Sequence, residues 1–156
     1  MTHRARRGGR RDQGQISELI IGLFAVTAAL VVGGIDVTAV QLARVRLVDA
    51  ADAAALDAAD ALDERTAYVQ GLPDSVALSN ATVAGAAAAY LEARPRPDGI
   101  GEWHLATGTG AEAGGTAVVA VDATVEIPWT GGILSALGRS VTIHATSRAR
   151  APLSAP

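Results

Sequence analysis

The stretch LIIGLFAVTAALVVGGI, residues 19–35, contains no charged side chain and decides the architecture of this chain. Just outside it on either side, Glu18 and Asp36 are the nearest interruptions of its apolar character. About 20 apolar residues, each rising about 1.5 Å along a helix, cross the ~30 Å hydrocarbon core of a bilayer. The sequence therefore predicts a single transmembrane helix at residues 16–40.

Basic residues are unevenly placed around this segment. Residues 1–14 hold five arginines and one acid, whereas the chain beyond Asp36 holds eight arginines and thirteen acids. Because positive charge favours the cytoplasmic side, we expect residues 1–15 to form a basic cytoplasmic tail. The C-terminal part is then extracytoplasmic, and the protein is single-pass in the cell membrane. A basic head and an acidic body argue against nucleic acid as the main partner.

A cleaved signal peptide is the rival interpretation of the same segment. It would have a basic start, an apolar middle and Val37-Thr38-Ala39 as a small-residue cleavage site. Two features favour a retained helix instead. The apolar run exceeds the usual 7–15 residues of a signal peptide, and the helical pattern continues past Ala39 without a break.

Two acids flank the apolar run, and each allows two interpretations. Glu18 is either a first-turn carboxylate favoured by the helix dipole or a determinant of assembly or processing. Asp36, beside Gly33-Gly34, lies either at the outer interface or in a buried contact with a partner helix, because carboxylates inside a membrane usually face protein.

A second helical region follows, in which Ala and Leu dominate and neither Gly nor Pro occurs between Val37 and Thr66. We predict that the helix continues as an Ala/Asp-rich stalk over residues 41–70. At 100° per residue, its acids gather on one arc, with Leu56 as an apolar exception among them. The opposite side is a helix-packing face made of Leu47, Ala51, Ala54, Ala55, Ala58 and Leu62. That face either packs on the chain's own domain or meets another molecule, since small residues allow close helix approach.

Residues 71–150 are predicted to form a small exported α+β domain. The expected order is a helix from about Val76 to Ala93, a short strand at 103–107 and a glycine-rich loop at 108–115. Alternating apolar and polar residues predict strands at 117–127 and 140–150, with one helical turn at the segment ILSAL between them. The fold class is thus α+β, with an antiparallel sheet of about three strands and a disordered tail at 151–156.

The chemistry of known active sites is missing from the sequence. There is no Cys, the glycine-rich segment GTGAEAGG has no Lys and so is no P-loop, and the three histidines are scattered. Trp103 and Trp129 are interpreted as core residues or residues at the membrane border rather than as a ligand site. We expect no catalytic residues, no metal, no cofactor and no small-molecule substrate.

The layout resembles the TadE/TadG-like proteins of tight-adherence (Flp, type IVb) pilus assembly. The resemblance rests on the basic tail, on Gln15-Ile16-Ser17-Glu18-Leu19 opening a membrane helix, and on the Ala-Asp segment Leu47–Leu56 that follows it. A late strand with alternating small and basic residues, Ala145–Arg150, fits as well.

The resemblance implies a pseudopilin-like or minor-pilin-like membrane protein that assists pilus assembly or export. Its partners would be the bilayer and other pilin-like or assembly proteins, copies of itself included. In pilin-like proteins a glycine precedes the processing site and a glutamate lies fifth in the mature chain. Here Gly14, Gln15 and Glu18 are the matching residues, although Glu18 would be fourth. The alternative is a stand-alone anchored or secreted binding module with the Trp103 and Trp129 region as its surface.

Overall fold

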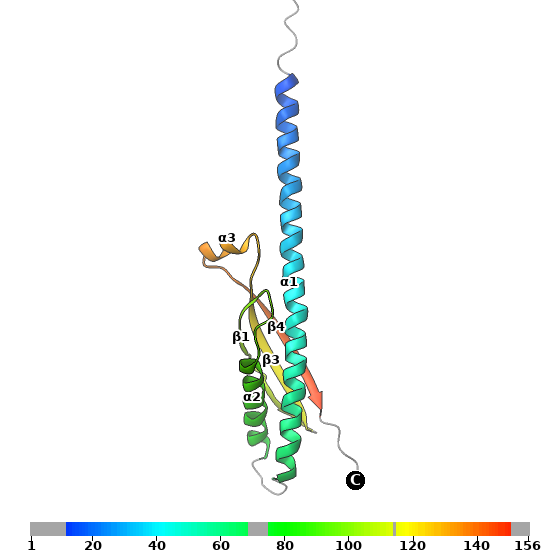
Figure 1. Cartoon of the computed structure of the whole chain (residues 1–156), viewed down its shortest axis with the longest axis vertical. Coiled ribbons are helices and arrows are strands. Elements are labelled where there is room, and N and C mark those ends of the chain that lie inside the picture. The colour runs from blue at the N-terminus through cyan, green and yellow to red at the C-terminus, as the bar shows by residue number, and fades with distance from the viewer. Residues whose placement is uncertain (1–11, 69–74, 114, 151–156) are drawn as a thin grey trace, which may run out of the picture.

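The computed structural model describes the backbone of residues 12–68, 75–113 and 115–150, and the side chains of 16–61, 80–113 and 115–150. Its dominant element is helix α1, Asp12–Tyr68, of 57 residues. At about 1.5 Å per residue it is roughly 85 Å long, and its N-terminal half stands clear of the rest of the molecule (Figure 1). The predicted membrane helix and stalk are therefore one uninterrupted helix.

The remaining elements gather beside the C-terminal half of α1 (Figure 1). Helix α2 ends one residue before Arg94-Pro95, as expected where a proline prevents the preceding residue from staying helical. The elements and their bounds are α2 Ser75–Ala93, β1 Ile100–Leu105, β2 Gly110–Glu112, β3 Thr116–Val125, α3 Gly131–Ala136 and β4 Val141–Arg150.

β3 is the central strand of an antiparallel four-stranded sheet. Along one edge it pairs with β4 over its whole length, from Thr116 opposite Arg150 to Val125 opposite Val141. Along the other edge it pairs first with β2 and then with β1. Because β3 has neighbours on both sides, its first half is buried almost continuously rather than in alternation.

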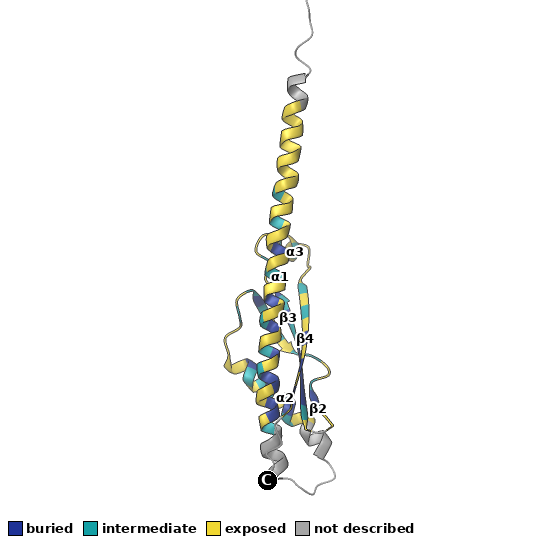
Figure 2. Ribbon diagram, turned by 90° about the vertical axis from the view of Figure 1, so that its right-hand side faces the viewer, coloured by how far each residue is buried: buried dark blue, intermediate teal, exposed yellow. Residues whose placement is uncertain are grey.

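The core lies between the sheet and the two long helices. α1 packs on β4, β3 and α2, while α2 also packs on β2. Figure 2 shows the consequence for α1, which is exposed along its N-terminal half and carries a buried stripe along its C-terminal half. The core is made of small side chains, since alanine and valine supply most of its members and Leu47 is one of the largest that are fully buried.

The predicted α+β class and antiparallel sheet are confirmed, but the sheet has four strands rather than about three. The additional strand, β2, lies inside the segment that we predict as a glycine-rich loop. With three residues, β2 is too short to show an alternating pattern in the sequence. It is held by backbone pairing with β3 and by the Ala111 N–H, which donates to Asn80 Oδ1 of α2 at 2.7 Å. Gly110 makes this possible, since a Cβ there would lie 2.6 Å from the same oxygen.

Candidate functional site

The apolar half of α1, residues 16–35, presents large hydrophobic side chains on every side. None of them is buried, and Phe24 is 74% exposed. A helix that is apolar all round needs an apolar environment, either a protein core or a membrane. Among the described residues, α1 is the one helix that is long and apolar enough to cross a bilayer. The exposed members include Ile16, Leu19, Ile20, Ile21, Leu23, Phe24, Val26, Leu30, Val31 and Ile35.

Asp36 ends this apolar half and is buried by the chain's own domain. Its carboxylate accepts the backbone N–H of Trp129 at 3.2 Å and that of Thr130 at 3.1 Å. The Thr130 hydroxyl donates a third hydrogen bond at 2.7 Å. Three donors on one carboxylate form a charge-assisted cluster, which satisfies a group that would be costly to bury alone.

This Asp36 junction connects α1 to the turn that precedes α3. The turn, Pro128-Trp129-Thr130, directly precedes α3, which lies at the end of the domain nearest the apolar half of α1 (Figure 1). The three bonds bridge more than 90 residues of sequence and join this turn to the end of the apolar half of α1. The predicted contact of Asp36 with a partner helix stays a prediction, because here its carboxylate is engaged within its own chain.

The predicted helix-packing face of the stalk lies against the chain's own domain. Leu47, Ala51, Ala54, Ala55 and Ala58 are all fully buried and belong to the hydrophobic core. The side chain of Leu62 lies outside the described residues. Of the two interpretations of this face, the geometry matches the intramolecular one, because α2 and the sheet occupy the surface that another molecule would need.

The acidic arc of the stalk is left open to solvent. Asp49, Asp52, Asp57 and Asp60 are exposed, and Leu56 among them is 60% exposed. Beside this arc, a groove runs between α1 and the segment after α2, where Arg46 donates to the Asp98 carbonyl oxygen. The groove is lined by Arg46, Asp49, Ala50, Ala53, Tyr90, Arg94, Pro95, Pro97 and Trp103.

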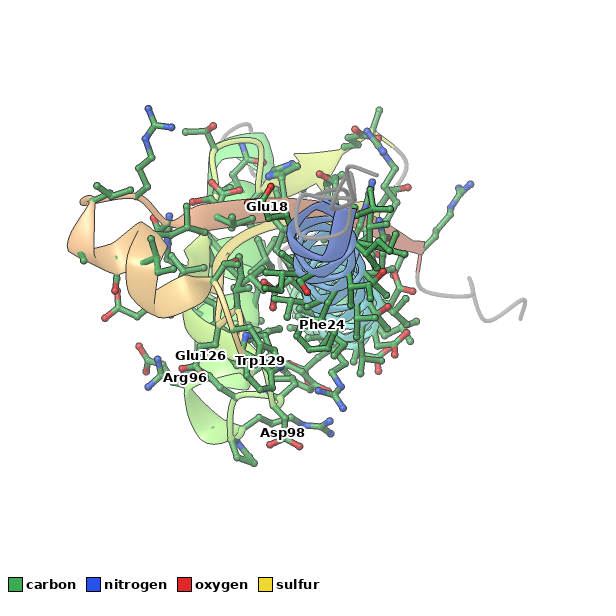
Figure 3. All side chains as sticks on the ribbon, turned by 90° about the horizontal axis from the view of Figure 1, so that it is seen from above. Glu18, Phe24, Arg96, Asp98, Glu126 and Trp129 are labelled. Atoms are coloured by element: carbon green, nitrogen blue, oxygen red, sulfur yellow. The ribbon has the colours of Figure 1, made fainter. Side chains whose placement is uncertain are left out.

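The processing candidates lie at the start of α1. Gly14 and Gln15 have helical backbone, but their side chains are outside the described set. Glu18 is exposed and lies six residues after the start of α1 at Asp12. Figure 3, which looks along α1 from its N-terminal end, labels Glu18 on α1, and Figure 1 shows this end of α1 standing clear of the sheet. The role assigned to these three residues therefore stays a prediction.

The sheet face away from the helices carries a polar cluster that the sequence analysis did not anticipate. Strand register puts Asp122 of β3 between His104 of β1 and His144 of β4. His144 Nδ1 lies 2.6 Å from an Asp122 carboxylate oxygen, and its Nε2 lies 2.9 Å from Thr146 Oγ1. Although these types recur in hydrolases, both histidines and Thr146 lie exposed on an open sheet face, which does not exclude water as an active site does.

The part of the chain that matches a known family lies within α1 and includes both its exposed apolar half and its buried stripe. Residues 14–61 match the family model described as "Putative Flp pilus-assembly TadE/G-like". This segment is TadE/G-like. The resemblance stated above is thereby confirmed for residues 14–61, while the late strand Ala145–Arg150 lies outside the match. The TadE/G-like segment begins before the apolar half of α1 and ends just beyond its buried stripe, so it leaves α2 and the sheet outside. No curated protein and no solved structure matches the chain.

Sequence reasoning identified Asp36 but missed the residues that bind it. Two of its three donors are backbone N–H groups, which every residue but proline possesses and which leave no compositional signal. The available hint was the turn-forming run Pro128–Gly132 after a strand. It predicts a turn there but says nothing of a carboxylate that is distant in sequence.

Proposed function

We propose that this protein is a non-enzymatic, membrane-anchored component of tight-adherence (Flp) pilus assembly or export, with a pseudopilin-like or minor-pilin-like role. One observation carries the proposal. The TadE/G-like segment coincides with a helix whose first part is exposed and apolar and whose second part carries the fold of the domain. Such a helix suits a protein whose work is done by packing in and just outside a membrane.

Membrane anchoring is supported by length and by burial together. Residues 16–35 are 20 residues, or about 30 Å of helix, which equals the thickness of a hydrocarbon core. A core helix of a soluble protein would be covered by neighbours, whereas this half of α1 has exposed side chains on all sides. The arginines before it favour a cytoplasmic N-terminus and an extracytoplasmic domain.

Other assembly proteins would then contact the surfaces of α1 that the chain's own domain does not cover. Within the bilayer this is the apolar half of α1, with Gly33 and Gly34 exposed beside Asp36. Outside the bilayer it is the acidic arc of the stalk, which a partner with basic side chains would complement. The stalk's packing face contributes indirectly, because it fixes the domain rigidly to the helix.

The decisive experiment is the intact mass of the protein purified from the membranes of its own host. A mature chain that begins at Gln15 would establish pilin-type processing after Gly14 and favour entry into the filament. A chain that keeps the arginines would be a permanently anchored assembly factor, and Gly14 would have no processing role. Recovery of the chain in the soluble fraction, with a new N-terminus after Ala39, would contradict the membrane-anchored proposal.

Orientation and the role of Glu18 need separate measurements. Protease added to intact spheroplasts is expected to digest the domain and spare the N-terminal tail. A Glu18→Ala variant is expected to lower pilus assembly while the protein remains in the membrane. Glu92→Ala, at an exposed glutamate of α2 outside the acidic arc, is the matched control for loss of one carboxylate. Unchanged piliation and partner binding in Glu18→Ala would remove the role assigned to that residue.

A second candidate function, an anchored or secreted binding module, rests on the groove beside Trp103. Its lining combines aromatic rings with arginines, including Arg94, whose guanidinium carbon lies 4.6 Å from the centre of the Tyr90 ring. Trp129 lies elsewhere, at the Asp36 junction, so the two tryptophans do not form one surface. This function would be favoured if deletion of the gene left piliation intact while Trp103→Ala abolished binding of a ligand to the exported domain.

A further inference from the structure

Helix α3 and its flanks present three large apolar side chains to solvent. Trp129, Ile133 and Leu137 are 64%, 65% and 69% exposed. Ile133 lies on α3 itself, Trp129 lies just before the helix, and Leu137 lies just after it. Exposed apolar groups of this size, carried by a short projecting element and its flanks, are typical of a surface that contacts a partner or a membrane.

The position of α3 indicates what covers it. The Asp36 junction holds Trp129 and Thr130 against α1 at the residue that ends the apolar half. α3 projects sideways from that level, at the end of the domain that faces the apolar half of α1 (Figure 1). The view along α1 likewise shows α3 extending away from the helix (Figure 3). If residues 16–35 fill the hydrocarbon core, α3 lies at its outer boundary.

The composition of the segment suits a lipid surface. Residues 127–140 contain no acid, and their one charged residue is Arg139. An arginine beside exposed apolar side chains favours anionic headgroups, and tryptophan is the residue most typical of the membrane–water boundary. The element is thus continuous in space and in chemistry with the membrane-exposed half of α1.

We propose that α3 and its flanks are a second membrane contact, in which Trp129, Ile133 and Leu137 enter the headgroup boundary of the outer leaflet. This inference rests on the proposed membrane anchoring. Two contacts, one spanning and one interfacial, fix the rotation of the domain about α1 and its distance from the membrane. The stalk's acidic arc is then presented in a fixed direction to neighbouring assembly proteins.

The test uses the full chain reconstituted in vesicles of phosphatidylcholine and phosphatidylglycerol. Trp103→Phe leaves Trp129 as the only tryptophan. Lipids brominated near the headgroup are expected to quench its fluorescence, and its emission is expected at shorter wavelength than in water. Leu137→Asp should remove most of the quenching. Leu56→Asp, the same change at a comparably exposed leucine of the stalk, should leave it unchanged. Absence of quenching in the parent protein, or equal effects of the two substitutions, would overturn the proposal.

A second reporter does not require the Trp103→Phe substitution, which changes a residue that packs against the core. The chain has no cysteine, so Leu137→Cys and Leu56→Cys each give a unique position for a spin label. The label at 137 is expected to be more accessible to oxygen than to a water-soluble nickel complex, and the label at 56 the reverse. Identical accessibilities at the two positions would refute the membrane contact.

A separate variant distinguishes failure of this contact from failure of the anchor. Phe24→Trp, combined with Trp103→Phe and Trp129→Phe, reports on the apolar half of α1. Quenching at position 24 by lipids brominated deep in their acyl chains, without quenching of Trp129 by lipids brominated near the headgroup, would overturn the role of α3 and leave the anchor standing. If neither position is quenched, the anchor itself fails and the role of α3 fails with it.

Discussion

The two halves of α1 use the same helix in opposite ways. From residue 16 to 35, large apolar side chains face outward on all sides and none is buried. From residue 43 to 59, a single stripe of alanines and one leucine is buried, while aspartates occupy the opposite side. The first half is apolar on every side, whereas the second half buries its alanine stripe against its own domain and exposes its aspartates together with Val45, Val48 and Leu56.

The two halves differ in the size of their apolar side chains and not in hydrophobicity alone. Leu, Ile and Phe maximise the apolar area offered to lipid, whereas alanine lets the backbone of α1 approach the sheet closely. The buried positions recur every three or four residues, Ala43, Leu47, Ala51, Ala54 and Ala58, as a core-facing stripe requires. The four predictions below test this contrast, from the largest expected effect to the smallest.

Removal of α1 should abolish the domain altogether. Residues 72–156 lack the buried stripe, so the sheet would expose its core face, and we expect the fragment to be unfolded by circular dichroism. Residues 41–156 keep the stripe and lose the apolar half, and this fragment should unfold cooperatively on heating. Cooperative unfolding of the shorter fragment would mean that the second half of α1 is not part of the core.

Shortening a leucine to alanine should destabilise the protein much more in the buried stripe than on the exposed arc. Leu47 is fully buried, so Leu47→Ala is expected to lower the free energy of unfolding by about 2–5 kcal/mol. Leu56→Ala, on the exposed arc, should change it by no more than about 0.5 kcal/mol. Denaturant titration of the 41–156 fragment measures both. Equal losses would show that the stripe is not what holds the domain to α1.

An introduced charge should impair membrane insertion when it is placed in the apolar half of α1 and should have no such effect in the stalk. Phe24→Arg places an arginine in the middle of the apolar half, where it disfavours membrane insertion by about 2.5–3.5 kcal/mol. Leu56→Arg changes a residue of comparable exposure in the stalk and should leave insertion unaffected. Alkaline extraction of membranes compares the two variants. Retention of both in the membrane pellet would argue that residues 16–35 are not the spanning segment.

Much of this contrast could be predicted from the sequence because it is periodic and local. The charge-free run predicted the exposed half, and the arc of Leu47 and its neighbouring alanines identified the stripe. The sequence could not say what covers that stripe, because a smooth alanine face suits the chain's own sheet and a second molecule equally well. Strand β2 was missed because three residues are too few to show alternation.

The contacts that sequence reasoning missed are those between distant residues. Thr130 lies 94 residues from Asp36, and its hydroxyl gives no sign of that partner. His104 and His144 likewise meet at Asp122 only through strand register. Element types follow from local pattern, whereas the Asp36 junction depends on how the whole domain is seated on α1.

The Asp36 junction marks the boundary between the two halves, and its loss should have the smallest effect. In Asp36→Asn one carboxylate oxygen becomes an amide NH2, which accepts no hydrogen bond, and the remaining oxygen loses its charge, so one of the bonds from the N–H groups of Trp129 and Thr130 is lost and the other is weakened. We expect hydrogen exchange at these two amides to rise several-fold, while the amides of β3 and β4 keep their protection, because the core does not depend on the junction. Asp49→Asn, at an exposed aspartate of the same helix, should change neither set. Loss of protection across the whole sheet in Asp36→Asn would mean that the junction carries the fold and is not merely the point where the domain is attached to α1.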